Sequence, residues 1–335
     1  KSVISEIVFN TSMTGYLEVL TDPSYAGQAV VMTYPLIGNY GVTPDMESAQ
    51  PWPDGYIVRE LSRIPSNFRC QGTIQDFLKE HDIPGIAGID TRALTKILRE
   101  KGTMNGMITT DENYKLDEIL PQLHVYNTGN VVDKVTCSEK EVLKADGYKV
   151  ALLDFGAKNN IAQSLHKRGC EVTIYPAHTT AEEILSSDPD GIMLSNGPGD
   201  PKACTDIIKE VKKLYDSEVP IFAICLGHQL MALATGADTY KLKYGHRGGN
   251  HPVKDLETGR VYISSQNHGY AVDADSLDQT VAVPAFTNVN DGTNEGLKYT
   301  GKNIFTVQFH PEACPGPQDS GYLFDKFIEM MGGQK

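Results

Sequence analysis

The feature that most constrains the fold is a regular alternation of short apolar runs and helical runs between residues 148 and 236. The β-prone runs occupy residues 149–155, 171–175, 191–194 and 219–224. Helical patterns separate them at residues 159–167, 181–186 and 205–215. Strands that alternate with helices on short loops form a parallel sheet covered on both faces. We therefore predict an α/β fold with a doubly wound, mostly parallel sheet in this half of the chain.

The first 140 residues have a different pattern, with β-prone runs at 4–9, 16–20 and 28–34 and turn signals between them. Two helices follow, with Thr73 and Asp90 as their predicted N-caps. A polar stretch precedes the alternating half. We predict an N-terminal mixed β/α domain over residues 1–140 and a second domain over residues 148–335.

Charge and composition exclude several classes of function. A formal net charge of -13 argues against a nucleic-acid-binding protein, because such proteins gain affinity from clustered Lys and Arg. No apolar run reaches the roughly 18 residues of a membrane span. The six cysteines are scattered, as in a reducing compartment. We expect a cytoplasmic protein. The sequence starts at Lys1 rather than Met, so the natural N-terminus is expected to be trimmed and any organellar targeting segment would lie outside this sequence.

A cysteine stands where the strand at 219–224 gives way to a helical run that ends near Gly236. The thiol of Cys225 would therefore face the unpaired N–H groups of a helix N-terminus, which favour a thiolate. Two alternatives stay open at this point: an inert buried cysteine, and a metal site with His228. The second lacks the further ligand pair of a structural zinc site.

A base for such a nucleophile lies far downstream, where His310 follows another apolar run and Glu312 comes two residues later. Cys225, His310 and Glu312 supply a nucleophile, a base and a group that orients the base. Their separation in sequence is no obstacle, because parallel strands bring their carboxyl ends to one edge of a sheet. We therefore predict a cysteine-dependent site at that edge.

Two polar segments are candidates for the rest of the site. The loop at 195–201 carries Gly197 and Gly199, and its backbone N–H groups could bind an oxyanion, although an ordinary turn is the alternative. The cluster at 264–270 is predicted as a recognition loop after a strand. We expect His246, His251 and His268 to be hydrogen-bonded structural residues rather than ligands, and to lie outside catalysis.

Three motifs in this order resemble the class I glutamine amidotransferases: Ser-Asn-Gly-Pro-Gly-Asp-Pro at 195–201, Ile-Cys-Leu-Gly-His-Gln at 224–229 and Gln-Phe-His-Pro-Glu at 308–312. Within that class, segments 8–16, 20–25, 89–94, 154–158 and 245–252 resemble the small subunit of carbamoyl phosphate synthetase. The resemblance covers nearly the whole chain and implies a flavodoxin-like second domain. Ala223, Tyr270 and Asn159 depart from residues frequent in the family.

The resemblance implies roles residue by residue. Cys225 is the nucleophile, His310 the base and Glu312 its orienting group, with the backbone of Gly199 and Leu226 as oxyanion donors. The glutamine-contacting positions are Ser24, Gly197, Gly199, Leu226, Gln229, Asn267, Gly269 and Tyr270.

The implied activity is that of a glutaminase subunit, which passes ammonia to a large synthetase subunit for carbamoyl phosphate synthesis in the arginine and pyrimidine pathways. ATP and magnesium are expected on that partner. This chain has no phosphate-binding Gly-Lys-Ser/Thr loop, and we expect it to bind neither a cofactor nor a metal. Three other hypotheses stay open: an amidotransferase for another synthetase, such as anthranilate or guanylate synthesis, a stand-alone cysteine hydrolase, and a binding module with a vestigial triad.

Overall fold

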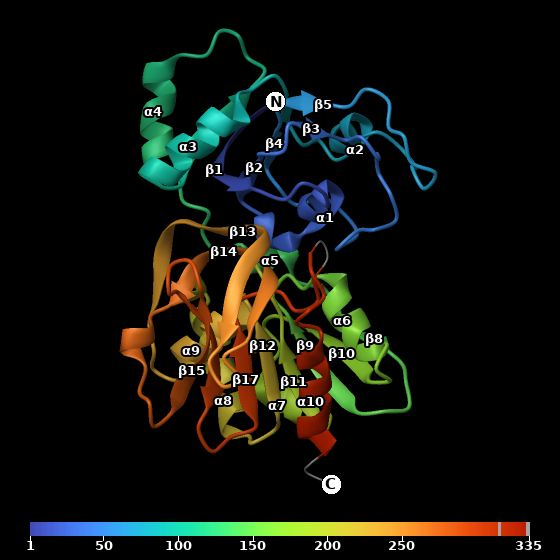
Figure 1. The fold of residues 1–335 in the computed structure, drawn as a ribbon, viewed down its shortest axis with the longest axis vertical. Coiled ribbons are helices and arrows are strands. Elements are labelled where there is room, and N and C mark those ends of the chain that lie inside the picture. Colours follow the sequence, from blue (N-terminus) through green and yellow to red (C-terminus); the bar gives the residue numbers. More distant parts are fainter. Residues whose placement is uncertain (314–315, 333–335) are drawn as a thin grey trace. The chain divides into compact units, whose positions relative to one another are not determined.

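The computed structural model describes residues 1–313 and 316–332 and divides the chain into two compact units, Lys1–Val131 and Val132–Lys335. Figure 1 shows the elements of both units. The second unit includes a strand that the sequence did not suggest: β8, Glu141–Leu143, pairs antiparallel with β10, Glu171–Pro176. It lies within the predicted linker, because an edge strand with exposed side chains carries no apolar pattern.

The first unit contains a five-stranded sheet in the order β6-β4-β2-β1-β7, in which only β7 runs antiparallel to its neighbour. Buried side chains of β1, β2, β4, α1 and α2 form its core. The elements of this unit are β1 Ser2–Asn10, α1 Tyr16–Thr21, the 3-10 turn η1 Pro23–Tyr25, β2 Gln28–Met32, β3 Leu36–Ile37, β4 Gly55–Ile57, β5 Glu60–Leu61, α2 Ile74–Glu80, β6 Gly85–Ile86, α3 Thr91–Lys101, β7 Met104–Thr109 and α4 Leu116–Val125.

The helix α1 corrects the prediction of a strand over residues 16–20. The β-prone side chains there are all used in the core, with Tyr16, Leu17 and Leu20 almost fully buried. Residues three and four apart share one face of a helix, so burial of this set favours the helix over the local β propensity. The predicted N-caps are confirmed: Thr73 and Asp90 each accept a backbone N–H at the start of α2 and α3.

The second unit contains a ten-stranded sheet in the order β14-β13-β15-β16-β17-β12-β11-β9-β10-β8. The strands β17, β12, β11, β9 and β10 are parallel, as predicted. The further elements of this unit are α5 Val132–Val135, β9 Lys149–Asp154, α6 Asn159–His166, α7 Ala181–Ser186, β11 Gly191–Leu194, η2 Pro201–Ala203, α8 Thr205–Asp216, β12 Ile221–Ile224, α9 Leu226–Ala234, β13 Thr239–Asp255, β14 Val261–Val272, η3 Ala274–Ser276, β15 Ala282–Asn288, β16 Asn294–Tyr299, β17 Ile304–Val307 and α10 Tyr322–Gly332.

Alternate side chains of the parallel strands point to two separate cores. Ala151 and Leu153 of β9 pack with residues of α7, α8 and α9. Val150 and Leu152 of the same strand pack with residues of α6 and α10 on the opposite face. Figure 1 shows these helices flanking the sheet. The doubly wound α/β architecture predicted from the sequence is therefore confirmed.

The antiparallel half of the sheet corrects a second prediction. The polar cluster at 264–270 lies inside β14 rather than in a loop, and it pairs with β13 through a register that shifts twice. Its polar side chains are buried and hydrogen-bonded, which gives a strand without the usual apolar alternation. Within the described residues no helix is long and apolar enough to cross a membrane.

Candidate active site

Four neighbouring parallel strands end at the same edge of the second sheet. Register pairs join Leu153 to Leu194, Leu194 to Ala223, and Ile224 to Val307, at or next to the carboxyl ends of β9, β11, β12 and β17. These strands lead in turn into segment 154–158, the loop at 195–201, Cys225, and the segment with His310 and Glu312. Loops after adjacent strand ends converge on one place, which is where open α/β sheets bind ligands.

Cys225 lies between β12 and α9 with φ 53° and ψ −106°, a conformation that residues with a side chain rarely adopt. Its backbone N–H donates to the carbonyl of Val307 at 2.8 Å, and its side chain is buried. Such backbone strain costs of order 1–3 kcal/mol and clusters at functional sites. Gly227 makes the turn possible, because a Cβ there would lie 2.5 Å from the carbonyl oxygen of Leu194.

His310 and Glu312 form a buried pair in the segment after β17. Nδ1 of His310 lies 2.6 Å from Oε1 of Glu312, and the N–H of His310 donates to the carbonyl of Ser265 at 2.9 Å. With Nδ1 held by the carboxylate, Nε2 is the nitrogen left for proton transfer. Nε2 makes no regular hydrogen bond within the described residues. The imidazole is therefore oriented as the base of a nucleophile–base–carboxylate arrangement requires.

The electrostatics of this pair favour a charged imidazole. Burial disfavours the imidazolium, but the Glu312 carboxylate and the nearby Cys225 side chain outweigh it, and the pKa of His310 is raised to about 10. Burial also raises the pKa of Glu312, whereas the charges of Lys158 and His310 lower it to about 2. At neutral pH this geometry therefore holds a proton donor beside a cysteine.

The glycine loop after β11 packs directly on the start of α9. The N–H of Gly227 donates to the carbonyl of Ser195 at 3.0 Å. Any side chain at Gly197 would collide with the carbonyl oxygen of Phe155 and lie 2.8 Å from Cδ2 of Leu226. Gly199 adopts φ +91°, which favours glycine. Gly197 therefore packs against Leu226, the residue that follows the cysteine, and Gly199 lies two residues further along the same loop. Their role as oxyanion donors stays a prediction.

The predicted contacts on β14 lie on the other side of the cysteine. Sγ of Cys225 is 3.8 Å from the carbonyl oxygen of Asn267. The side-chain amide of Gln229 donates to the carbonyl of Tyr270 at 2.8 Å and to Oε1 of Gln308 at 2.9 Å. Gly269 lies between these two backbone carbonyls in the strand. These contacts link Asn267, Gln229 and Tyr270 to Cys225, because the N–H of Gln229 also donates to the carbonyl of Cys225 at 3.2 Å.

Ser24 lies in the first unit, in η1, where its N–H donates to Oδ1 of Asp22 at 2.9 Å and its side chain is buried. Its contact with glutamine stays a prediction.

Sequence reasoning missed Lys158, the residue at the N-cap of α6. Its Nζ lies 3.1 Å from Oε1 of Glu312, and both side chains are buried. The amide of Asn160 also donates to the backbone carbonyl of Glu312. Lysine is almost never fully buried without a partner, so its burial could not be foreseen from residue type. Two signals were available: its position four residues after the end of β9, at the functional edge of the sheet, and its place in segment 154–158, which resembles the family.

Fold and site together define a class. Residues 151–330 match the family model of the class-I glutamine amidotransferases. A structure of a candidate GMP synthase component from Thermoplasma acidophilum has the same fold, with a TM-score of 0.51 and 23% identity over 57% of this chain and 97% of that one. The second unit is therefore a class I glutamine amidotransferase domain.

The first unit makes the assignment narrower. Residues 1–108 match the model of the carbamoyl-phosphate synthase small chain, CPSase domain. The carbamoyl phosphate synthase small chain of Listeria monocytogenes is 52% identical over 337 residues, 100% of this chain and 92% of the relative. That of Clostridium perfringens is 52% identical over 98% of this chain and 93% of the relative. The chain belongs to the carbamoyl-phosphate synthase small chain family. It is the glutamine amidotransferase component of an enzyme, the ligase carbamoyl phosphate synthase.

Proposed function

We propose that Cys225 hydrolyses glutamine through a thioester, with His310 as acid and base and Glu312 as its orienting carboxylate. The thiolate adds to the side-chain amide carbon of glutamine, the C–N bond breaks, and His310 gives its proton to the departing ammonia. Water then adds to the thioester while His310 takes one of its protons, and glutamate leaves as the C–S bond breaks. The buried pair of His310 and Glu312, 2.6 Å apart beside the cysteine, carries this proposal.

The other predicted residues act on the substrate. Backbone N–H groups of Gly199 and Leu226 stabilise the oxyanion, since this charge develops only as the thiol adds. Gly197, Gln229, Asn267, Gly269, Tyr270 and Ser24 contact glutamine. The polar groups of β14 and the amide of Gln229 support this role for the second unit, because they lie around the cysteine. For Ser24 the support is the family resemblance of its segment.

The ammonia is passed to a large synthetase subunit, which is the partner that a small chain implies. ATP, magnesium and bicarbonate bind to that subunit, and this chain needs no cofactor of its own for glutamine hydrolysis. Membership in the small chain family supports this division of labour.

The decisive experiment is Cys225→Ser, with Cys204→Ser as the matched control. Both thiols are buried at the start of a helix, but only Cys225 has the His310 pair beside it. We expect Cys225→Ser to abolish glutamate release while calorimetry still detects glutamine binding, because a hydroxyl ionises far less readily than a thiol. Cys204→Ser should keep wild-type turnover. Turnover in both variants would contradict the proposal.

The role as a subunit needs a second measurement. Glutamate release by the wild-type chain should accelerate when the large subunit, ATP and bicarbonate are added. Hydrolysis that is unaffected by them, with glutamyl conjugates accepted equally well, would instead indicate a stand-alone hydrolase.

A further inference from the structure

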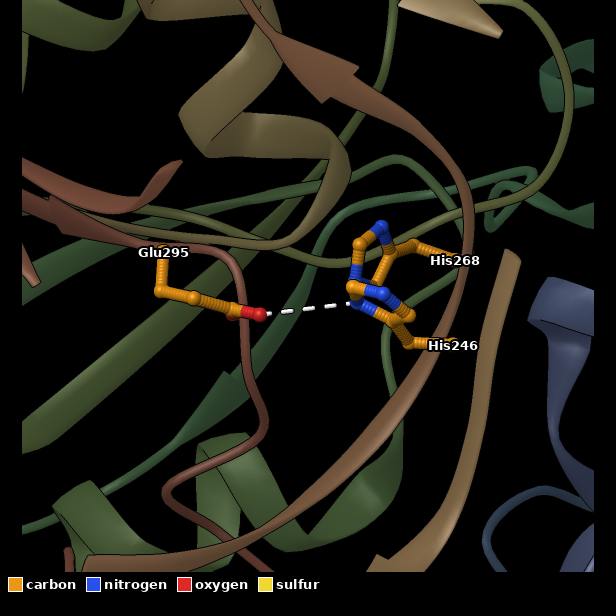
Figure 2. A group of neighbouring side chains, drawn as sticks. All are labelled: His246, His268 and Glu295. Carbon is orange, nitrogen blue, oxygen red and sulfur yellow. Dashed lines mark ion pairs between the residues drawn. The ribbon is translucent and has the colours of Figure 1, made fainter. Parts of the chain in front are cut away.

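Three buried side chains outside the proposed catalytic set converge in the antiparallel half of the second sheet. They are His246 on β13, His268 on β14 and Glu295 on β16, and Figure 2 shows them pointing toward one another. One nitrogen of each histidine and one carboxylate oxygen lie within 4.8 Å of one another. Glu295 is completely buried. The three groups could therefore meet a single small cation.

A hydrogen bond on the outer side of each histidine leaves its other ring nitrogen facing the cluster. Nε2 of His246 lies 2.8 Å from Oδ2 of Asp291, and Nδ1 of His268 lies 2.7 Å from the carbonyl oxygen of Tyr270. In metal sites a ligand histidine usually donates its other N–H to a carboxylate or a backbone carbonyl, which fixes the tautomer. Here the carboxylate of Asp291 holds His246 and the backbone carbonyl of Tyr270 holds His268.

The inner atoms are incompletely satisfied. Nδ1 of His246 and Oε2 of Glu295 have no hydrogen-bond partner in the described part of the chain. Oε1 of Glu295 accepts from the Asn288 amide at 2.9 Å and lies 3.5 Å from Nδ1 of His246, the contact dashed in Figure 2. A carboxylate oxygen buried without a partner is costly, so a positively charged occupant would be favoured.

One further atom borders the cluster. Nε2 of His268 lies 2.7 Å from Oε1 of Gln266. With its proton on Nδ1, Nε2 of His268 offers a lone pair, and a cation there would either take the amide oxygen as a fourth ligand or displace it.

We propose that His246, His268 and Glu295 form a binding site for a divalent transition-metal cation of the zinc type. Two imidazole nitrogens and one carboxylate oxygen suit zinc or cobalt, whereas magnesium and calcium prefer oxygen ligands alone. The cation would tie β13, β14 and β16 together. His268 directly follows Asn267, whose carbonyl faces the Cys225 sulfur, so the site would brace the strand beside the cysteine. Its role is structural, and it takes no part in glutamine hydrolysis.

The competing occupant is a proton. An imidazolium at His246 that donates to both Asp291 and Glu295 would satisfy the same carboxylates without a metal. The experiment must therefore detect the cation itself, and it must first remove the thiolate of Cys225, which is a stronger ligand than anything in the cluster.

The Cys225→Ser chain, treated with a chelator and dialysed, is titrated with Co²⁺ and followed by visible absorption, then by competition with Zn²⁺. We expect one equivalent to bind with the intense bands of a four-coordinate cobalt site. His246→Gln or Glu295→Gln in the same background should weaken binding by at least about a hundredfold, and Asp291→Asn by about 10- to 100-fold. His178→Gln is the matched control, since it removes an exposed histidine paired with Asp133 at 2.6 Å, and it should change nothing.

X-ray absorption at the zinc edge of the loaded Cys225→Ser chain keeps the test decisive even if the cluster variants fail to fold. Two imidazole ligands are expected. Three results would each overturn the proposal in favour of the proton. The first is a folded Cys225→Ser chain that binds no cation at 100 µM (about 5 kcal/mol of binding free energy). The others are cation binding that Glu295→Gln leaves unchanged and a zinc coordination sphere without two imidazoles.

Discussion

Nζ of Lys158 lies 3.1 Å from Oε1 of Glu312, although the two residues are 154 positions apart and both side chains are buried. The same oxygen accepts from Nδ1 of His310 at 2.6 Å. Glu312 is therefore held by two positive groups at once, which keeps it ionised in a site where burial alone would neutralise it.

We expect Lys158→Met to destabilise the fold by on the order of 3 kcal/mol, because removal of one partner leaves a buried charge without full compensation. Glutamate release should fall as well, since a weakened hold on Glu312 misplaces His310. Chemical denaturation and glutaminase assays on the same sample measure both effects. Lys212→Met is the control, because Lys212 pairs with Asp216 at 2.6 Å on an exposed helix face. If the two variants unfold at the same denaturant concentration, the buried pair has no special importance.

Removal of the Glu312 carboxylate should shift the pH range in which the chain hydrolyses glutamine. Glu312 is the main cause that raises the pKa of His310, so Glu312→Gln should lower that pKa from about 10 toward its ordinary value. Because the protonated imidazole is the proposed acid, the alkaline fall in kcat should occur at lower pH in this variant than in the wild type. Rate profiles between pH 6 and about 10.5 check this. An alkaline limb that does not move would mean that another group titrates there.

Gly197→Ala should distort the proposed oxyanion loop, because a Cβ at this position collides with the backbone of Phe155. A shift of about 1 Å in a catalytic group can cost on the order of a hundredfold in rate, so kcat should fall far more than glutamine affinity. Gly72→Ala is the control, since its Cβ would meet no atom within 4 Å. Wild-type kcat for Gly197→Ala would remove the loop from the mechanism.

Ser24→Ala should weaken glutamine binding if the resemblance of its segment holds for this chain. The backbone N–H of Ser24, and not its hydroxyl, is capped by Asp22, so the substitution keeps this cap. Asp22→Ala is the matched variant: it removes the cap at a cost of about 1 kcal/mol and should lower the thermal midpoint without a comparable loss of affinity. Calorimetric affinity and midpoint are measured for both. Unchanged affinity in Ser24→Ala would leave the serine a purely structural role.

The sequence by itself determined the architecture of the second unit and the chemistry of its site. Alternating strand and helix patterns give a doubly wound sheet, and the carboxyl ends of parallel strands must meet at one edge. The segments with Gly197, Cys225 and His310 each follow such a strand, so their convergence could be predicted from order alone. These features depend on local periodicity, which can be read from a single sequence, and on a general rule of sheet topology.

Only the tertiary structure decided the features that depend on long-range burial. Residues 16–20 have β propensity but form the helix α1, because their side chains fill a core built by distant strands. The buried Lys158 is paired with the carboxylate of Glu312, and the cluster of His246, His268 and Glu295 exists only because three strands bring it together. The positive φ of Cys225 likewise occurs where the start of α9 packs closely on β11. Burial and pairing of this kind depend on residues that are distant in sequence but close in space. They could therefore not be predicted from residue type or spacing.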